Sequence, residues 1–275
     1  MTEKQERLVK AFDAEAWPLY GARLAGMIGK AFTPRAGARV LVLGGASGHL
    51  ALALARALDA ESRVVSFEAA PALAAQARRR TDSDPALAAR IAILEGSAAP
   101  FAFDTGSFDA AIFCAGGGDG ITVEDGTAEL VRALRPGGQL IAALPLRGAW
   151  AEFLDIFRGV LRDNRKAEGL AALDRYIAAL PEGDAPAAAL EQAGFHDVTM
   201  TIDRWELLFK SAREFFFAPV IELGPLPRWK AIAGHGDEMQ DIFFFIKEAI
   251  DAYFAGGVFS LSVVAGCVKG TKAAS

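Results

Sequence analysis

Cysteine, histidine and tyrosine are scarce in this chain of 275 residues, with two, three and three copies respectively. The two cysteines, Cys114 and Cys267, form no Cys-x-x-Cys pair, a usage that excludes a disulfide framework and favours a reducing compartment. The histidines lie far apart, and no histidine, cysteine and carboxylate cluster has the spacing of metal ligands. We therefore expect no metal site.

Long apolar runs and basic patches are missing as well. No run approaches the roughly 18 residues that a membrane-spanning helix requires, and the opening Met-Thr-Glu-Lys-Gln-Glu-Arg lacks the apolar core of a signal peptide. The formal net charge is −5, and lysine and arginine are scattered rather than clustered. These absences predict a cytoplasmic protein with no membrane span and no nucleic-acid partner.

What the chain does have is apolar content, 52% of its residues, enough for a large core. The most informative segment is 39–56. Residues 40–43 form a short apolar run typical of a strand in a parallel sheet, and Gly44, Gly45 and Gly48 then precede an Ala/Leu-rich helix. Such a turn brings backbone N–H groups to the carboxyl edge of the sheet, where open α/β folds bind small ligands.

Strands and helices alternate after this turn, which predicts an α/β fold with a doubly wound, mostly parallel sheet and right-handed crossovers. A sixth strand within 195–208 and a last, antiparallel strand at 258–268 complete a seven-stranded, Rossmann-like sheet. The other predicted strands are 40–43, 64–67, 91–94, 108–113 and 139–144, with helices at 48–58, 71–80, 127–134 and 185–193.

Three helical segments lie outside this alternation. Residues 1–38 are expected to form an N-terminal helical flap of two helices, broken near Trp17-Pro18 because proline disfavours helix at the preceding residue. Residues 39–275 form the α/β domain, with helical inserts at about 146–182 and 211–256. Both inserts leave the carboxyl ends of strands, so we expect them to form a lid over the glycine turn.

The insert 211–256 is very aromatic, and three interpretations stay open. Its rings pack the lid onto the sheet, line the cleft of an apolar or aromatic acceptor, or form a surface for a homodimer or a protein partner.

Glu68 ends the second predicted strand, about 20 residues beyond the glycines, where a carboxylate accepts hydrogen bonds from a ribose. A nicotinamide dinucleotide and S-adenosylmethionine both fit. The run Gly44-Gly-Ala-Ser-Gly48 resembles the glycine segment of short-chain dehydrogenases, but the third glycine of that pattern would fall at Leu50. None of the three tyrosines is followed by lysine four residues later, as those reductases require.

Four stretches together resemble the class I S-adenosylmethionine-dependent methyltransferases. The resemblance implies a Rossmann-like fold with an antiparallel last strand and an S-adenosylmethionine cofactor. The four stretches are Val40-Leu-Val-Leu-Gly-Gly-Ala-Ser-Gly48, Val65-Ser-Phe-Glu68, Pro100-Phe-Ala-Phe-Asp-Thr-Gly-Ser-Phe-Asp109 and Leu134-Arg-Pro-Gly-Gly-Gln-Leu140.

The first motif is degenerate. The family usually has an acidic residue where this chain has Val42, glycine where it has Ala46, and an acidic residue facing adenine where it has Ser97. A left-handed alanine costs about 1–2 kcal/mol, so we expect a turn of different shape rather than a strained Ala46.

Candidate site residues follow from the resemblance. No catalytic signature is present, and Asp119, after the fourth strand, is a weak candidate base, while His49 is expected to face solvent. The candidate cofactor-binding residues are Gly44, Gly45, Ala46, Gly48, Glu68, Ala69, Ser97, Ala98 and Cys114.

The leading prediction is methyl transfer from S-adenosylmethionine to a small, apolar or aromatic acceptor beneath the helical lid. The alternative is a methyltransferase-like protein without catalytic activity that serves as a binding or scaffold module, motivated by the altered motif and the glycines at 116–118. An NAD(P)-dependent reductase is the lesser alternative.

Overall fold

The structure, a computed structural model, describes residues 2–68, 70–96, 102–115, 123–255 and 257–274. Contacts between these residues define two compact units. The first unit holds residues 1–144, 184–201 and 266–275, and the second holds 145–183 and 202–265.

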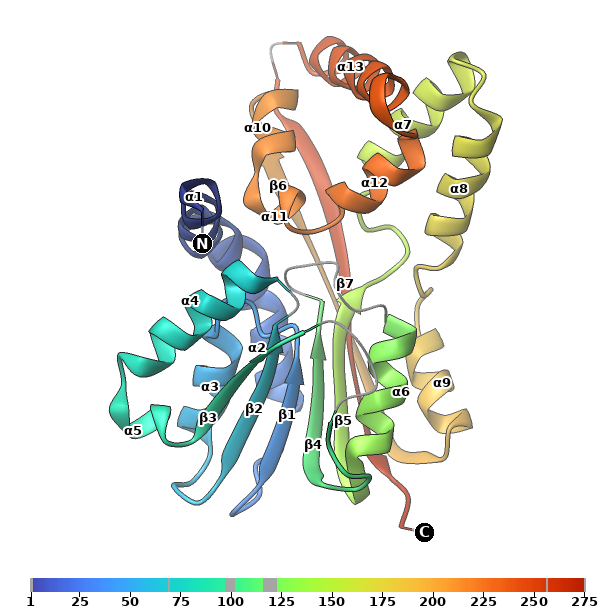
Figure 1. Cartoon of the computed structure of the whole chain (residues 1–275). Helices are drawn as coiled ribbons and strands as arrows, with labels where there is room; N and C mark the ends of the chain where they lie inside the picture. Colours follow the sequence, from blue (N-terminus) through green and yellow to red (C-terminus); the bar gives the residue numbers. More distant parts are fainter. Residues whose placement is uncertain (1, 69, 97–101, 116–122, 256, 275) are drawn as a thin grey trace. The chain divides into compact units, whose positions relative to one another are not determined.

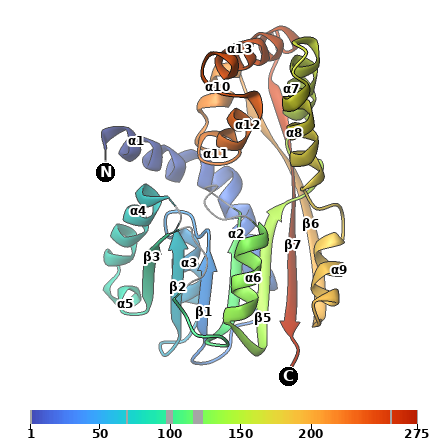
Figure 2. The same cartoon turned by 45° about the vertical axis from the view of Figure 1, so that its right-hand side comes forward.

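A seven-stranded sheet runs in the order β3-β2-β1-β4-β5-β7-β6. Strands β1 to β5 pair in parallel, and β7 runs in the opposite direction (Figure 2). The predicted doubly wound sheet with an antiparallel last strand is therefore confirmed. The strands are β1 Arg39–Leu43, β2 Arg63–Glu68, β3 Ile91–Glu95, β4 Phe108–Cys114, β5 Leu134–Pro145, β6 Phe195–Phe209 and β7 Phe259–Lys272.

Strand β1 lies between β2 and β4, and its register sets where the ligand edge lies. Leu43 pairs with Phe67 of β2 and with Phe113 of β4. Residues 40–43 are fully buried, as the continuous apolar run predicts for a central parallel strand. Because the three strands end level, the residues that follow Leu43, Phe67 and Phe113 meet at one edge of the sheet.

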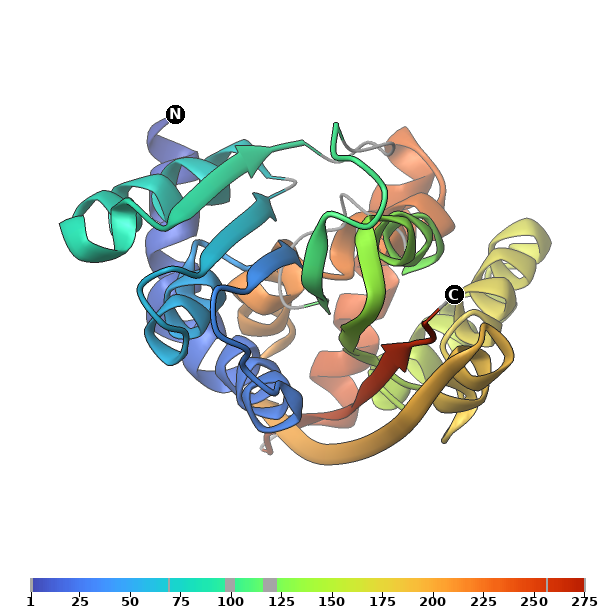
Figure 3. The same cartoon turned by 90° about the horizontal axis from the view of Figure 1, so that it is seen from below.

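Helices cover both faces of the sheet in the first unit. Helices α3 and α4 pack against β2 and β3, and α6 packs against β4. Helices α2 and α3 lie on one face and α6 lies on the other (Figures 1 and 3). The helices of this unit are α1 Glu3–Ala11, π-helix η1 Phe12–Gly21, α2 Ala22–Ala31, α3 His49–Ala57, α4 Pro71–Asp82, α5 Pro85–Ala88, α6 Val123–Ala133 and α9 Ala185–Gln192.

The N-terminal segment does not break at Trp17-Pro18, and that prediction is wrong. Pro18 lies inside the ten-residue π-helix η1, which continues α1 into α2. The proline ring presses on the preceding turn of an α-helix, and a wider π-turn relieves that contact. The segment is also tied to the sheet, since the Thr33 amide donates to Gln139 Oε1 of β5 at 3.1 Å.

Strand β5 begins earlier than expected. Residues 135–138, which separate the helix predicted at 127–134 from the strand predicted at 139–144, lie within the bounds of the strand. Phe108 pairs with Leu134 and Ala110 with Gln139, so the register shifts and the Arg-Pro-Gly-Gly run is accommodated as an irregularity of the strand.

The second unit has an aromatic core. Phe153 stacks on Trp229 with ring centroids 4.0 Å apart, and both are fully buried, as is Phe215. Other rings of the insert are exposed, with Phe217 at 69% and Tyr253 at 81%. Its helices are α7 Ala151–Asp163, α8 Ala167–Ala178, α10 Ala212–Phe217, α11 Pro219–Glu222, α12 Leu226–Ala233 and α13 Gly236–Tyr253.

None of the helices in the described residues combines the length and apolar character that crossing a membrane demands.

Candidate functional site

The candidate site is built where β1, β2 and β4 end. The Gly44 amide donates to the Phe67 carbonyl at 3.1 Å. Gly44 has φ +76°, and a Cβ built on it would lie 2.2 Å from the Cys114 carbonyl oxygen. Gly44 is therefore required both for its left-handed backbone and for the close approach of two strand ends. The predicted site residues Gly44 and Cys114 are neighbours.

Gly45 contacts the end of β2. A Cβ at Gly45 would lie 2.6 Å from Ser66 Oγ and 2.7 Å from Glu68 Oε1. The Ser66 hydroxyl donates to the same Glu68 oxygen at 3.0 Å. The glycine thus leaves room for a carboxylate against the turn, and the predicted pair of Gly45 and Glu68 is brought together.

Gly48 is the N-cap of α3 and has φ +86°. A Cβ there would lie 3.0 Å from the Cα of Ala77 in α4. The third glycine of the motif is therefore required by helix packing within the protein. All three glycines have a structural cause in addition to any contact with a ligand.

The two residues between the glycines adopt unusual backbone angles. Ala46 has φ +47° and Ser47 has φ +45°, and both are fully buried. The expectation that the turn would change shape to avoid a left-handed alanine is wrong. Two consecutive non-glycine residues remain in the left-handed region, so other contacts must offset a cost of about 1–2 kcal/mol for each.

Glu68 is a buried carboxyl group with unusual chemistry. Its side chain is 1% exposed, and no lysine or arginine pairs with it in the part of the chain that is described. Burial raises the pKa of Glu68 to about 7, although hydrogen bonds from Ser66 and from the Ala46 and Gly45 amides lower it in part. A carboxyl that titrates near neutrality at a strand end is typical of functional sites.

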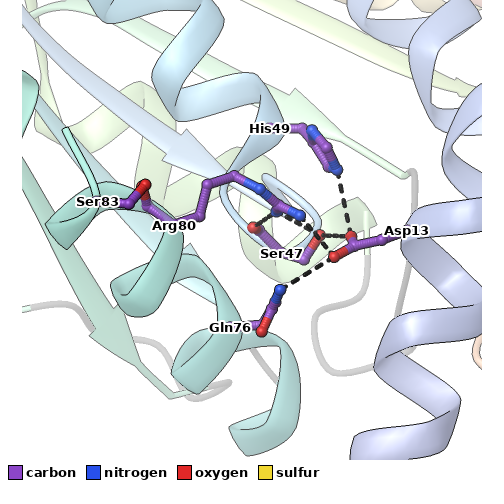
Figure 4. A network of polar contacts seen from close by, with 6 residues as sticks. All are labelled: Asp13, Ser47, His49, Gln76, Arg80 and Ser83. Atoms are coloured by element: carbon purple, nitrogen blue, oxygen red, sulfur yellow. Dashed lines mark hydrogen bonds and ion pairs between the residues drawn. The ribbon is translucent and has the colours of Figure 1, made fainter.

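A second polar network engages Ser47 of the turn (Figure 4). Its centre is Asp13 of π-helix η1. Ser47 Oγ donates to Asp13 Oδ1 at 2.6 Å, and Arg80 Nη2 of α4 lies 2.5 Å from Asp13 Oδ2. Arg80 Nη1 also donates to the Ser47 carbonyl and, at 3.0 Å, to Ser47 Oγ. Gln76 Nε2 donates to Asp13 Oδ2 at 3.2 Å.

His49 belongs to the same network, and the expectation that it faces solvent is wrong. Its Nε2 lies 3.2 Å from Asp13 Oδ1, and its side chain is 26% exposed. Trp17 stacks on the imidazole with centroids 4.3 Å apart and planes 9° from parallel. Burial raises the pKa of Asp13, but hydrogen bonds from His49 and Ser47 and the charge of Arg80 outweigh it and lower the pKa to about 2.

Reasoning from the sequence missed Asp13, Gln76 and Arg80. Each is a polar residue on an amphipathic helix, a pattern that is typical of a solvated face. The non-glycine residues inside the glycine turn were the one available signal, because a strained turn requires support from elsewhere.

Four predicted site residues, Ala69, Ser97, Ala98 and Asp119, lie outside the described residues. Within the described ranges, no group of three or more histidine, cysteine and carboxylate side chains is placed to hold a metal ion.

The arrangement can recognise a ligand that carries hydroxyl donors. The Gly44 amide is bonded to the Phe67 carbonyl, and the Gly45 and Ala46 amides are bonded to Glu68. Glu68, provided that it is ionised, has acceptor capacity for further donors such as a diol.

Residues 40–138 match a protein-family model described as "Methyltransferase domain". The predicted resemblance is thereby confirmed over the stretch that carries the glycine turn, Glu68 and β4. No curated protein matches the chain significantly.

Solved structures share the fold at low identity. YcgJ from Bacillus subtilis is 15% identical with a TM-score of 0.55, covering 92% of this chain and 100% of that one. S-adenosylmethionine-dependent methyltransferases from Thiobacillus denitrificans and Geobacter sulfurreducens, both in complex with S-adenosylhomocysteine, are each 17% identical. Their TM-scores are 0.52 and 0.53, with 92% of this chain and 91% of theirs covered. At such identity the likeness establishes the fold.

Proposed function

We propose that this chain, whose residues 40–138 match a methyltransferase domain, binds S-adenosylmethionine at the glycine turn and transfers its methyl group. The observation that carries the proposal is the pairing of Glu68 with the Gly45 and Ala46 amides at the carboxyl ends of β2 and β1. Two structural neighbours with this fold hold S-adenosylhomocysteine, the demethylated product.

The residues present fit the cofactor in one respect. Glu68 would accept hydrogen bonds from the ribose hydroxyls. Glu68 is buried without a cationic partner among the described residues, so an ionised Glu68 lacks the contacts that a ribose diol provides. Because Glu68 is 1% exposed, binding requires the residues around it to rearrange.

The cofactor, when bound, supplies a methyl group on a sulfonium, whose carbon–sulfur bond breaks as the acceptor's lone pair attacks. The chain itself needs to bind, orient and exclude water, so a catalytic base is not obligatory. This agrees with the sequence motifs, which contain no nucleophilic side chain paired with a general base.

The proposal extends to a small, apolar or aromatic acceptor under the helical inserts 146–182 and 211–256. The aromatic core of the second unit supports it, as does a cavity of about 120 Å³ in that unit. The cavity is lined by Phe216, Phe217, Glu222, Leu226, Lys230 and Phe243. Mainly apolar and aromatic walls with a small number of polar groups, here Glu222 and Lys230, are typical of sites for small ligands.

A specific observation favours a second candidate, a methyltransferase-like binding module without catalysis. Ala46, Ser47 and Glu68 are all at most 1% exposed, so protein atoms fill the space beside the turn. A chain that has replaced its cofactor by its own side chains is expected to bind S-adenosylhomocysteine weakly or not at all.

Calorimetric titration of the purified chain with S-adenosylhomocysteine tests the proposal. The expected result is micromolar affinity, lost in Glu68→Ala and unchanged in Glu61→Gln, which alters an exposed carboxylate just before the same strand. A parallel titration with NADH tests the reductase alternative. Folded protein that binds no S-adenosylhomocysteine at millimolar concentration contradicts the proposal and favours the binding module.

Methyl transfer itself is measured with isotope-labelled S-adenosylmethionine and an extract of apolar and aromatic small molecules. Label in the organic phase that depends on Glu68 supports an apolar acceptor. Binding of the cofactor without transfer to any fraction favours the module that binds but does not catalyse.

A further inference from the structure

The turn between β1 and α3 is held in a conformation that its own residues disfavour. Ala46 and Ser47 both have positive φ, and each Cβ then crowds a carbonyl oxygen. Gly44 and Gly48, the flanking left-handed residues, do not carry this penalty. Residues in such regions persist where surrounding contacts determine them.

The contacts that oppose this strain converge on Ser47 and come from outside the turn. The hydroxyl donates to Asp13 at 2.6 Å, and one nitrogen of Arg80 donates to both the carbonyl and the hydroxyl of Ser47. The other terminal nitrogen of Arg80 lies 2.5 Å from Asp13. The three side chains form a closed ring, in which Ser47 is fully buried.

Further contacts hold the ring in place. Gln76 donates to the second Asp13 oxygen at 3.2 Å, and His49, stacked under Trp17, lies 3.2 Å from the first. Both oxygens of Asp13 are therefore engaged by two groups each. A planar guanidinium that binds a carboxylate and a backbone carbonyl together is a rigid, oriented contact.

We propose that Asp13 and Arg80 are positioning residues that clamp Ser47, and that the clamp keeps Ala46 left-handed and the Gly45 and Ala46 amides directed at Glu68. The clamp replaces the conformational freedom that a glycine at position 46 supplies. This deepens the proposed function and rests on it in one respect, that Glu68, which these amides hold in place, receives the ribose hydroxyls of S-adenosylmethionine.

The alternative is an ordinary ion pair that docks the N-terminal segment 3–31 on α4. The two differ in what happens when Ala46 becomes glycine. A clamp supports two left-handed residues, Ala46 and Ser47, so Ala46→Gly removes part of the strain that it opposes and partly suppresses the effect of removing it. If the ion pair only docks the N-terminal segment, the effect of removing it is the same with alanine or glycine at position 46.

Hydrogen exchange of the protein without ligand makes the first test, in Asp13→Asn, Ala46→Gly and the double variant. We expect Asp13→Asn to speed exchange of the amides in 44–50 about tenfold, the ratio that corresponds to 1.4 kcal/mol of lost support. The double variant is expected to return to within about threefold of wild type, since glycine adopts positive φ without strain. Residues 195–209 serve as the internal reference.

Matched controls separate the clamp from a general loss of charge pairing. Glu95→Gln removes an exposed ion pair that Arg78 makes from the same helix α4, and it is expected to leave exchange in 44–50 unchanged. If Asp13→Asn does not fold, Arg80→Lys keeps the charge but cannot bond Asp13 and both Ser47 oxygens at once. Faster exchange confined to 3–31, whatever residue occupies position 46, overturns the clamp.

Titration with S-adenosylhomocysteine makes the second test. We expect about tenfold weaker binding in Asp13→Asn and recovery in the double variant, the same ratio as in exchange. A wild type that binds nothing contradicts the proposed function, while the exchange experiment still decides the clamp. Wild-type affinity in Asp13→Asn, with or without faster exchange of the turn, overturns the positioning role and leaves the proposed function intact.

Discussion

Two carboxyl groups contact the glycine turn, and their environments are opposite. Asp13 is bonded to Arg80, Ser47, His49 and Gln76, and its pKa is lowered to about 2. Glu68 has a serine hydroxyl and two backbone amides as partners, and burial raises its pKa to about 7.

This difference in partners and pKa indicates that Asp13 is a structural carboxylate and that Glu68 is suited to binding a ligand. Asp13 stays ionised at any physiological pH, and its four partners leave it no capacity for a further donor. Glu68 exchanges its proton near neutrality and gains most from new donors such as a ribose diol. The strained backbone between them transmits support from Asp13 to the amides beside Glu68.

The largest expected effect comes from removing the close approach of Gly44 to the end of β4, where the turn begins. Gly44→Ala places a Cβ 2.2 Å from the Cys114 carbonyl and gives alanine a φ of +76°. We expect the free energy of unfolding in urea to fall by roughly 3 kcal/mol, from backbone strain and overpacking together.

Gly37→Ala is the matched control, since Gly37 has φ +65° with no atom within 4 Å of a built Cβ. It is expected to cost only the left-handed penalty of about 1 kcal/mol. Equal losses in the two variants would contradict the packing role of Gly44.

Neutralising the two carboxylates is expected to change stability in opposite directions. At pH 8, Glu68→Gln removes a poorly solvated charge and raises the free energy of unfolding by about 2 kcal/mol. Asp13→Asn leaves Arg80 without its carboxylate partner and lowers the free energy of unfolding by about 2 kcal/mol. Urea denaturation of both variants at one pH measures this, and a loss in both would show that Glu68 is a structural carboxylate too.

Titration of Glu68 predicts a dependence on pH. Its folded pKa of about 7 lies above the ordinary 4.5, so the folded state holds the proton more tightly. Its contribution to stability is present below pH 4.5 and is lost as pH rises through 7. Asp13, with its folded pKa lowered to about 2, contributes stability above pH 3.8 that is lost only as pH falls toward 2.

Ligand binding is expected to follow the ionised form of Glu68. Affinity for S-adenosylhomocysteine should rise about tenfold between pH 6 and 8, the ratio of ionised carboxyl for a pKa near 7. Calorimetry across this range measures it, with Glu68→Gln as the reference for all other titrating groups. An identical pH profile in that variant would remove Glu68 from the site.

The smallest expected effect comes from Trp17, which contacts the Asp13 network through His49. Trp17→Leu removes the ring stacked on His49 and is expected to lower the free energy of unfolding by about 1 kcal/mol. Leu19→Ala, in the same π-helix with 57% of its side chain exposed, serves as control and is expected to change it by less than about 0.5 kcal/mol.

The contact between the glycine turn and Glu68 was predictable from the sequence, and the contact of the turn with Asp13 and Arg80 was not. Gly44 and Gly45 follow one strand of a parallel sheet and Glu68 ends the next, so the order of elements alone brings them to one edge. Asp13 and Arg80 are separated by 67 residues, and nothing in their local sequences distinguishes them from solvated charges on amphipathic helices.

Two local predictions failed for related reasons. Proline at position 18 predicts a break, and alanine at position 46 predicts a relaxed turn, because each residue's intrinsic preference disfavours what the structure contains. In both places tertiary contacts override the preference, through the π-turn that packs Tyr20 into the core and through the ring around Ser47.

The sequence by itself determined the order of strands and helices, the antiparallel last strand and the position of the glycine turn opposite Glu68. These depend on hydrophobic periodicity and on chain connectivity, which short segments encode. The tertiary structure alone decided that Asp13 and Arg80 meet over Ser47, that Ala46 stays left-handed and that Glu68 is buried without a cation in the described chain. Each of these depends on surfaces from separate helices packing together, where the energy of a contact is set by burial and not by the residues nearest in sequence.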